Sequence, residues 1–337
     1  MPSKKIKNVY FLEKLPSLNS ICGSAFVICD QKLKSQIQNW CKGQKVYFVQ
    51  AGERLKDLNQ FALHTKNILK SISKAPQAPS AFIGVGGGSV TDFTGFFSSI
   101  YKRGKPVYYI PTTLLSAVDA SHGGKTALNV SSVKNVLGTY HFPQKVFIIK
   151  HLFQGIKSSE VFSAYGELIK IALIHNISLY ESLKQQSKPS FDHFWKVMPS
   201  AIKSKLELVE KDPFEKKSVR RFLNLGHTLG HCFESYHKIP HGRAVAMGTL
   251  FALHWSADKK FISSSLYSET QNLIKHYIKV SSILKIPLVR LKKLLRQDKK
   301  SISSGKIEFV FIKGIGKPFI KTVSIDDIVQ FYKKYYL

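Results

Sequence analysis

The feature that most narrows the possible folds is an alternation of short apolar runs and helical segments over the first 110 residues. The apolar runs cover residues 25–29 (AFVIC), 45–49 (KVYFV), 81–85 (AFIGV) and 107–110 (VYYI), and apolar residues at helical spacing occupy 60–73. Apolar runs without alternation are typical of parallel strands that are buried on both faces. The alternation therefore predicts an α/β protein with a mostly parallel sheet wrapped by helices.

A glycine-rich turn, residues 84–89 (GVGGGS), joins the third run to the next helix. Glycines in such a turn let the backbone approach a phosphate closely, and the free N–H groups of the helix start attract an anion. Ser89 stands where the fingerprint G-x-G-x-x-G has its third glycine, so the fingerprint is incomplete. The turn still favours dinucleotide or phosphate binding, while Asp92 would stabilise the first helical turn in any case.

Asp30 ends the first apolar run. In dinucleotide-binding folds, an acidic residue at a strand end accepts hydrogen bonds from a ribose hydroxyl. A plain turn aspartate is the alternative, and the residue taken alone favours the turn.

The chain has 337 residues, of which 44% are hydrophobic, so it can bury a sizeable core and is long enough for two domains. After about residue 150 helical patterns dominate, over 168–183, 196–209, the segment around His227, 244–260 and 266–283. Residues 306–312 (KIEFVFI) give the one clear strand signal there. We expect domains at 1–150 and 151–337.

Lys and Arg number 51 against 21 Asp and Glu, giving a formal net charge of +30. This excess attracts anions, but it is spread along the chain and accompanies no nucleic-acid-binding motif. No apolar stretch is long enough for a membrane span or a signal-peptide core. The four cysteines form no C-x-x-C pair. We expect a reduced, cytoplasmic protein without nucleic-acid or membrane partners.

Three histidines, His227, His231 and His241, lie close together in the sequence. If the segment around His227 is helical, His227 and His231 project from one face one turn apart and could share a metal ion. A set of hydrogen-bonded helix histidines is the alternative, and the spacing alone leaves both interpretations open.

Residues 110–138 form a dense polar block around Gly123-Gly124. It contains Thr112, Thr113, Asp119, Lys125, Asn129, Lys134 and Asn135. Lysines suit phosphates and carboxylates as point charges, and asparagines orient hydroxyls. A long solvated loop is the alternative, but loops of this length in compact domains are usually functional.

The order and spacing of the motifs resemble those of the 3-dehydroquinate synthases, a family of sugar-phosphate cyclases, over about residues 23–315. The motifs are Gly52-Glu53-x-x-Lys56, Gly86-Gly87-Gly88-Ser89-x-x-Asp92, Arg103-Gly104, Pro111-Thr112-Thr113-Leu114-Leu115, Val118-Asp119-Ala120-Ser121, Gly123-Gly124-Lys125-Thr126, Lys134-Asn135, Glu167-x-x-Lys170, Arg220-x-x-Leu223-Asn224-x-Gly226-His227-Thr228-x-Gly230-His231, His241-Gly242 and Asp298-Lys299-Lys300. The resemblance implies a Rossmann-like NAD-binding domain, a mainly helical domain binding Zn²⁺ or Co²⁺ and substrate, a site in the cleft between them, and a homodimer.

The resemblance also implies roles for individual residues. Metal ligands would be Glu167, His227 and His241, leaving His231 for substrate and proton handling; without the family, Glu167 would be a surface carboxylate paired with Lys170. NAD would contact Asp30, Glu53, Lys56, Gly87, Gly88, Ser89, Asp92, Thr112, Thr113, Leu115 and Lys134. The substrate phosphate and carboxylate would contact Arg103, Lys125, Asn135, Arg220 and Lys299 or Lys300, and further substrate groups Asp119, Lys170, Lys205 and Asn224.

The implied reaction converts a phosphorylated seven-carbon keto acid to 3-dehydroquinate with loss of phosphate, using NAD that is regenerated in each turnover. A sister cyclase making an inosose or valiolone-type ring and a metal-dependent polyol dehydrogenase are alternatives. Asn224 and His231 favour the dehydroquinate reaction. Three positions depart from the family pattern towards positive charge: Arg243 replaces a Glu, Lys150 an Asp and Asn176 an Asp. Loss of a carboxylate beside a metal ligand could weaken metal binding.

Overall fold

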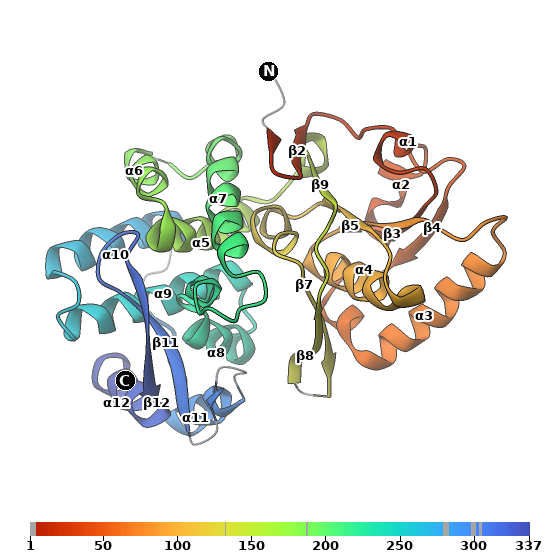
Figure 1. The fold of residues 1–337 in the computed structure, drawn as a ribbon. Helices are drawn as coiled ribbons and strands as arrows, with labels where there is room; N and C mark the ends of the chain where they lie inside the picture. Colours follow the sequence, from red (N-terminus) through yellow and green to blue (C-terminus); the bar gives the residue numbers. More distant parts are fainter. Residues whose placement is uncertain (1–4, 132, 187, 279–282, 298–300, 303–304) are drawn as a thin grey trace. The chain divides into compact units, whose positions relative to one another are not determined.

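The computed structural model describes the chain apart from residues 1–4, 132, 187, 279–282, 298–300 and 303–304. The chain forms two compact units, Met1–Ile156 and Lys157–Leu337. Figure 1 shows the first unit as a sheet with helices and the second as mainly helical. The expected α/β class is confirmed, with a parallel sheet in the N-terminal unit. Within the described residues, no helix combines the length and the apolar character that crossing a membrane requires.

The N-terminal unit is built on a seven-stranded sheet in the order β1-β2-β9-β6-β5-β3-β4. The strands are β1 (Lys5–Ile6), β2 (Val9–Leu12), β3 (Ala25–Asp30), β4 (Lys45–Val49), β5 (Ala81–Gly86), β6 (Val107–Pro111) and β9 (Lys145–Ile149). All neighbouring pairs are parallel except β1 with β2. The four apolar runs are β3 to β6. Sequence patterning missed β1, β2 and β9, which extend the sheet on the side away from β4.

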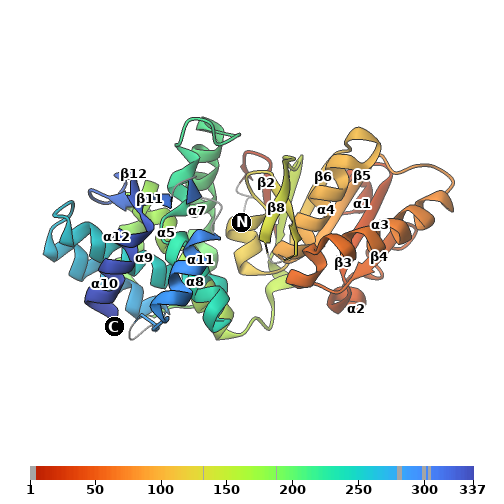
Figure 2. The same cartoon turned by 90° about the horizontal axis from the view of Figure 1, so that it is seen from below.

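Both faces of the central strands are covered, as unbroken apolar runs require. On one face, Val27, Ile83 and neighbouring side chains pack with α1 (Leu18–Ile21) and α2 (Lys34–Ile37). On the other, the Phe82 ring meets Phe97, with ring centroids 5.1 Å apart. Phe97 lies on α4 (Gly88–Ile100), which packs beside α3 (Leu58–Ser73). Figures 1 and 2 show the two helix layers on opposite sides of the sheet.

The described residues of the polar block 110–138 form regular elements over most of its length, so the alternative of a long solvated loop is wrong. After β6 the chain forms a π-helical turn at Ser116–Ala120, then a hairpin of β7 (Lys125–Val130) and β8 (Val133–Tyr140). Thr126 and Leu128 of β7 are buried, which anchors the hairpin on the unit. Asn129, Asn135 and Gly138 hid these strands from patterning, because Asn and Gly are depleted in strands.

The C-terminal unit contains the helices α5 (Ser158–His175), α6 (Ile177–Gln185), α7 (Phe191–Lys211), α8 (His227–His237), α9 (His241–Asp258), α10 (Ser264–Ile278), α11 (Leu288–Arg296) and α12 (Ile325–Tyr336). A small antiparallel sheet joins β10 (Ser301–Ile302), β11 (Lys306–Ile312) and β12 (Pro318–Ser324). The strand expected at 306–312 is β11. The neighbouring strand β12 was missed because its side chains alternate poorly between apolar and polar.

The single helix expected over 168–183 is broken at Asn176. Its Oδ1 accepts a hydrogen bond from the Leu179 N–H (2.8 Å), which caps α6. Its Nδ2 donates to Ser204 Oγ on α7 (2.7 Å). An aspartate could cap the helix but could not donate the second bond, so Asn at this position fastens α6 to α7.

The segment around His227 also differs from the expected continuous helix. Residues Arg220–Asn224 form a 3₁₀ turn, η6, and α8 begins at His227 after Gly226, which has a φ of 78°. His241 is likewise the first residue of α9. Two of the three clustered histidines therefore begin helices.

Candidate functional site

The side chains expected to hold a dinucleotide lie at the carboxyl ends of the parallel strands. Asp30 ends β3, Glu53 follows β4, Gly87 follows β5 and Thr112 follows β6. These strands are neighbours in the sheet, so the four positions share one edge. β3 leads outwards to β4, whereas β5 leads to β6 on the other side, which makes the β3–β5 boundary a topological switch point. Ligands of open α/β sheets bind outside such points.

The turn after β5 has no room for larger side chains. A Cβ on Gly86 would lie 2.7 Å from Val90, and one on Gly87 would lie 3.1 Å from the Thr113 methyl group. α4 begins at Gly88, so its first N–H groups face the sheet edge. Ser89 Oγ accepts a hydrogen bond from the Gly52 N–H (3.0 Å), which ties this turn to the one after β4.

Asp30 makes the local contact that the turn interpretation predicts. Its carboxylate accepts a hydrogen bond from the Lys32 N–H at 3.1 Å. Its position at the sheet edge is also the one expected of a ribose-binding residue. Both roles are compatible, because the second carboxylate oxygen is not needed for this turn bond.

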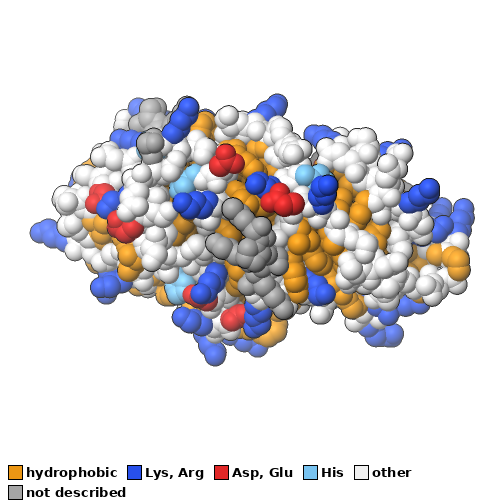
Figure 3. All heavy atoms as spheres, turned by 90° about the horizontal axis from the view of Figure 1, so that it is seen from above, with side chains coloured by type: hydrophobic (Ala, Val, Ile, Leu, Met, Phe, Trp, Pro, Cys, Tyr) orange, Lys and Arg blue, Asp and Glu red, His pale blue; other side chains and the backbone are white. Residues whose placement is uncertain are grey.

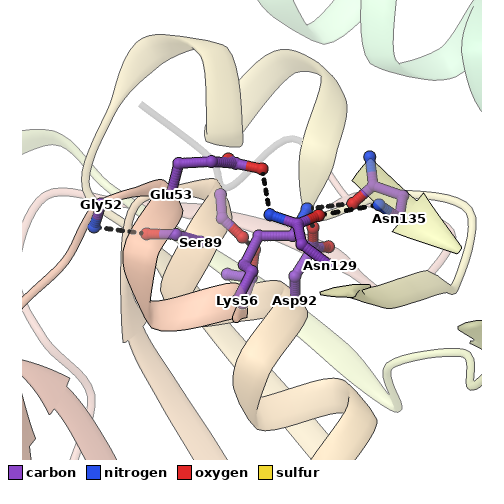
Figure 4. A network of polar contacts seen from close by, with 9 residues as sticks. Gly52, Glu53, Lys56, Ser89, Asp92, Asn129 and Asn135 are labelled. Atoms are coloured by element: carbon purple, nitrogen blue, oxygen red, sulfur yellow. Dashed lines mark hydrogen bonds and ion pairs between the residues drawn. The ribbon is translucent and has the colours of Figure 1, made fainter. Parts of the chain in front are cut away.

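A polar network joins the turn after β4, helix α4 and the hairpin (Figure 4). Lys56, which is buried, pairs with Asp92 (Nζ–Oδ2 2.6 Å) and donates to Asn135 Oδ1. Asn129 donates from Nδ2 to Glu53 Oε1 (2.7 Å) and accepts from the Asn135 N–H (2.7 Å). Burial raises the pKa of Asp92, and the adjacent Lys56 ammonium opposes that effect. The network therefore holds four expected site residues in place, Glu53, Lys56, Asp92 and Asn135, with Asn129 as the link between Glu53 and Asn135.

Asn129 was recognised as part of the polar block but not as a site residue. A β-bulge lies between Leu128 and Val130, so both Leu128 and Asn129 are buried. Strict alternation would have turned one of them to solvent. The bulge is what directs Asn129 into the network, and no spacing in the sequence reveals it. Beside the network lies a pocket of ≈ 430 Å³, lined by Glu53, Arg54, Asp57, Asn59, Gln60, Asn129 and Ser131.

In the C-terminal unit, α5, α8 and α9 approach one another closely through glycines. A Cβ on Gly166 of α5 would overlap the carbonyl of Gly242, and one on Gly242 would overlap the carbonyl of Ser163. A Cβ on Gly226 would lie 2.7 Å from the Val245 carbonyl oxygen of α9. Gly166 precedes Glu167, Gly226 precedes His227 and Gly242 follows His241. Each of these three site residues is therefore placed by a glycine next to it.

Glu167, His227 and His241 meet at this crossing. One ligand atom from each lies within 4.8 Å of the others, and Glu167 is fully buried. The Nε2 atoms of His227 and His241 lie 3.6 and 3.5 Å from Glu167 Oε1. Ligands of a tetrahedral zinc lie about 3.3–3.4 Å apart, given metal–ligand distances of about 2.0–2.1 Å. The donor set and its spacing therefore fit Zn²⁺ or Co²⁺.

His231 adjoins this cluster from the next turn of α8. Its ring centroid lies 5.3 Å from that of His227 and 6.1 Å from that of His241. It is exposed and does not join the group of three whose ligand atoms converge within the described residues. This position suits contact with a molecule bound beside the cluster.

Neighbouring groups orient the three convergent side chains. His227 Nδ1 faces the Leu225 carbonyl oxygen at 3.3 Å, and His241 Nδ1 faces Glu234 Oε2 at 2.7 Å. Lys170 pairs with Glu167 Oε2, so Oε1 is the oxygen that faces the imidazoles. The Glu167–Lys170 pair exists, but it is buried and not on the surface. Burial lowers the pKa of His241, yet hydrogen bonds and charges from Glu167 and Glu234 outweigh it and raise the pKa to about 10.

Six charged side chains of the described residues are buried: Lys56, Glu167, Lys170, Lys205, Asp212 and Arg220. Burying a charge is costly unless it is paired or used. Five of the six are expected site residues, and three are cations on elements that pack together: Lys170 on α5, Lys205 on α7 and Arg220 on η6. Asn224, half-buried, ends the same turn η6. The C-terminal unit thus holds a concentration of positive charge suited to an anion.

Asp212 is the buried charge that sequence reasoning missed. Its carboxylate accepts hydrogen bonds from the N–H groups of Lys217 (3.0 Å) and Arg220 (3.3 Å). Burial raises its pKa, but these bonds outweigh that effect and hold the pKa below its usual value. Arg220 in turn donates from Nη1 to the Pro213 carbonyl (2.7 Å). Asp212 therefore holds the segment that presents Arg220, and its only sequence signal is an Asp-Pro pair after a helix.

The remaining expected residues are more scattered. Asp119 lies in the π-helical turn, whereas Lys125 and Lys134 are exposed on the hairpin. Thr113 Oγ1 accepts a hydrogen bond from the Ser116 N–H (3.2 Å), and Leu115 precedes the π-helical turn. Arg103 follows α4, at the end opposite the glycine turn, about 20 Å along the helix. Lys299 and Lys300 lie outside the described residues.

Comparison with known proteins identifies the family to which the sequence motifs belong. The family model described as 3-dehydroquinate synthase N-terminal matches residues 46–163, and the one described as 3-dehydroquinate synthase C-terminal matches residues 164–301. The chain belongs to the 3-dehydroquinate synthase family. A 3-dehydroquinate synthase of Picrophilus torridus is 32% identical over 282 residues, covering 83% of this chain and 81% of the relative. The resemblance drawn from the motifs, and with it the expectation of an enzyme, is confirmed.

Solved structures show the same fold in other cyclases. A 2-deoxy-scyllo-inosose synthase complexed with carbaglucose-6-phosphate, NAD⁺ and Co²⁺ has a TM-score of 0.80 at 21% identity, covering 96% of each chain. A 2-epi-5-epi-valiolone synthase from Streptomyces hygroscopicus with NAD⁺ and Zn²⁺ has a TM-score of 0.81 at 19% identity, covering 99% of this chain and 98% of that one. The 3-dehydroquinate synthase family thus shares its fold with cyclases that make other rings.

Proposed function

We propose that this chain converts 3-deoxy-D-arabino-heptulosonate 7-phosphate to 3-dehydroquinate and phosphate, as a carbon–oxygen lyase of the shikimate pathway. The observation that carries the proposal is the convergence of Glu167, His227 and His241 in a chain of this family. The buried cations Lys170, Lys205 and Arg220 support it, because the substrate carries both a carboxylate and a phosphate.

NAD is the proposed cofactor of the N-terminal unit, where it would supply hydride transfer to and from the carbon that bears a substrate hydroxyl, the hydroxyl proton passing to a base. The switch point between β3 and β5 and the glycine turn before α4 support this role. Glu53 is suited to accept hydrogen bonds from ribose hydroxyls. The full proposed set is Asp30, Glu53, Lys56, Gly87, Gly88, Ser89, Asp92, Thr112, Thr113, Leu115 and Lys134.

Glu167, His227 and His241 are the proposed ligands of Zn²⁺ or Co²⁺, which would act as a Lewis acid towards substrate hydroxyls. The cyclase structures with NAD⁺ and Co²⁺ or Zn²⁺ support both assignments. His227 and His241 are also the first residues of α8 and α9, so two helix N-termini adjoin the cluster. Helix N-termini favour negative charge, which suits an oxygen that becomes anionic during reaction.

The polar side chains of the chain would position the substrate. In the C-terminal unit, Lys170, Lys205, Arg220 and Asn224 would bind carboxylate and hydroxyl oxygens, and His231 would exchange a proton with substrate. Lys125, Asn135 and Asp119 are further proposed substrate contacts, as is Lys299 or Lys300, which lie outside the described residues. Groups fixed before the substrate arrives lower the barrier most, and the buried positions of Lys170 and Arg220 provide this.

A homodimer in the cytoplasm is part of the proposal. Arg103, a proposed contact of the substrate phosphate or carboxylate, is exposed and lies about 20 Å along α4 from the glycine turn, a position that suits the substrate of a second copy. The four cysteines form no disulfide, and burial raises the pKa of the Cys41 thiol to about 11, so it stays unreactive. Lys and Arg are scattered over the face in Figure 3 without gathering in one patch.

The test is phosphate release from the seven-carbon substrate, with and without a chelator and NAD. We expect release that needs both the metal and NAD, with 3-dehydroquinate as product and no net accumulation of NADH. A cyclised product of another sugar phosphate would indicate a sister cyclase. Stoichiometric NADH without phosphate release would indicate a polyol dehydrogenase. Either result would overturn the proposal.

A further inference from the structure

Glu234 lies on the same face of α8 as His227, two helical turns further on. This spacing brings its carboxylate to the start of α9, where Oε2 lies 2.7 Å from His241 Nδ1. The helix that presents His227 to the proposed metal site therefore also presents an acid to the ring of His241. The sequence motifs gave Glu234 no role.

The contact determines which nitrogen of His241 is available. An ionised carboxylate can only accept a hydrogen bond, so Nδ1 must carry a proton. In the neutral ring the lone pair then lies on Nε2, the atom 3.5 Å from Glu167 Oε1. At His227 the same arrangement uses the Leu225 carbonyl, at 3.3 Å. When a metal ion replaces the proton on Nε2, both imidazoles can therefore offer it a lone pair beside the same carboxylate oxygen.

The hydrogen bond from His241 Nδ1 to Glu234 and the one from His227 Nδ1 to the Leu225 carbonyl differ in strength. A hydrogen bond to a charged carboxylate is roughly twice as strong as one to a neutral carbonyl. A carboxylate behind a metal-binding imidazole also raises its basicity and holds its orientation. Arg243 stands where the resemblance leads us to expect a carboxylate, two residues after His241, whereas Glu234 places a carboxylate against the His241 ring through space.

We propose that Glu234 is a positioning residue that holds His241 in its metal-binding tautomer and orientation, and thereby sets the affinity for the divalent ion. The proposal rests on the proposed metal site. It makes no claim that Glu234 touches substrate.

The experiment compares the full-length wild type with Glu234→Gln, Glu234→Ala and the control Glu207→Gln. Glu207 forms a similar pair with His175 on the same unit (Nε2–Oε2 2.9 Å), and neither residue belongs to the cluster. Zinc dissociation constants are measured by competition with a chromogenic chelator. The visible spectrum of the Co²⁺-loaded protein reports ligand geometry, and thermal melting of the metal-free proteins reports folding.

We expect Glu234→Ala to weaken zinc binding about 10–100-fold and to change the Co²⁺ spectrum, with Glu234→Gln about 10-fold weaker. Gln keeps an acceptor for Nδ1 but loses the charge, so its smaller effect would separate orientation from charge. Glu207→Gln should bind zinc within about twofold of the wild type, since it only removes a distant negative charge. The metal-free variants should melt close to the wild type.

Wild-type zinc affinity and an unchanged Co²⁺ spectrum in both Glu234 variants would overturn the inference while leaving the proposed function intact. An equal loss in Glu207→Gln would also overturn it, because net charge alone would then explain the effect. A wild type that binds no zinc would instead remove the metal site on which the proposed function depends.

Discussion

The polar network around Lys56 and the cluster around Glu167 are assembled in opposite ways. In the N-terminal unit, side chains from a turn, a helix and a hairpin bond to one another, and Asn129 links Glu53 to Asn135. In the C-terminal unit, glycines let the backbones of α5, α8 and α9 touch, and the site residues follow from the backbone. One site is held together by its side chains, and the other by the helices beneath them.

The difference corresponds to the kind of ligand each site is proposed to hold. A dinucleotide offers many hydroxyl and phosphate oxygens, and rotamer changes of side chains can adapt to them. A metal ion needs donors at about 2.0–2.1 Å, so small shifts of a helix would disrupt the geometry. Packed helices hold donors more accurately than loops do. Substitutions that separate backbone from side-chain effects therefore test the comparison.

The largest effect is expected from Gly242→Ala. A methyl group there would overlap the Ser163 carbonyl oxygen, forcing α9 away from α5. We expect the C-terminal unit to lose about 3 kcal/mol of unfolding free energy and most of its zinc affinity. Urea unfolding followed by circular dichroism, with zinc titration, measures both. Gly23→Ala is the control, because a Cβ there meets nothing within 4 Å. Equal stability of the two variants would show that backbone contact does not build the cluster.

A smaller effect is expected from Asn129→Leu. The substitution leaves the Asn135 N–H and the Glu53 carboxylate without their bonds to Asn129, at a cost of about 1–2 kcal/mol. NAD affinity, measured by calorimetry, should fall roughly 10-fold while zinc affinity stays unchanged. Asn59 lines the same pocket, and the control substitution Asn59→Leu should leave NAD affinity nearly unaltered. Unchanged NAD binding in Asn129→Leu would mean that the network does not prepare the cofactor site.

The smallest effect is expected from Arg243→Glu. Arg243 is exposed in the first turn of α9, where an acidic side chain interacts better with the helix N-terminus than a basic one. We expect about 0.3–1 kcal/mol of added stability and phosphate release equal to the wild type or higher. Thermal melting and a steady-state assay check this. A large loss of activity would show that Arg243 has been recruited to the site.

The sequence predicted those parts of the molecule whose signal is local. The strands β3 to β6 follow from their apolar runs, and the turn before α4 follows from its glycines. The hairpin was missed because Asn129, Asn135 and Gly138 interrupt the strand pattern. The roles of Asn129, Asp212 and Glu234 were not predicted, because their contacts depend on tertiary structure. A β-bulge directs Asn129, a loop folds back onto Asp212, and the neighbouring helix α9 brings His241 to Glu234. The grouping of Glu167 with His227 and His241 came from the family resemblance, since spacing alone equally allowed His227 with His231.

The glycine crossing of α5, α8 and α9 also has a consequence for how the C-terminal unit opens. Glu167 is far from His227 and His241 in the chain, so all three donors exist together only when α5 is docked. An ion held by them would bind the docked state alone, and the free energy needed to undock α5 would then rise with the logarithm of the ion concentration once that concentration exceeds the dissociation constant. Amide hydrogens of α5 should then exchange more slowly as zinc is added, while those of the sheet in the other unit keep their rates.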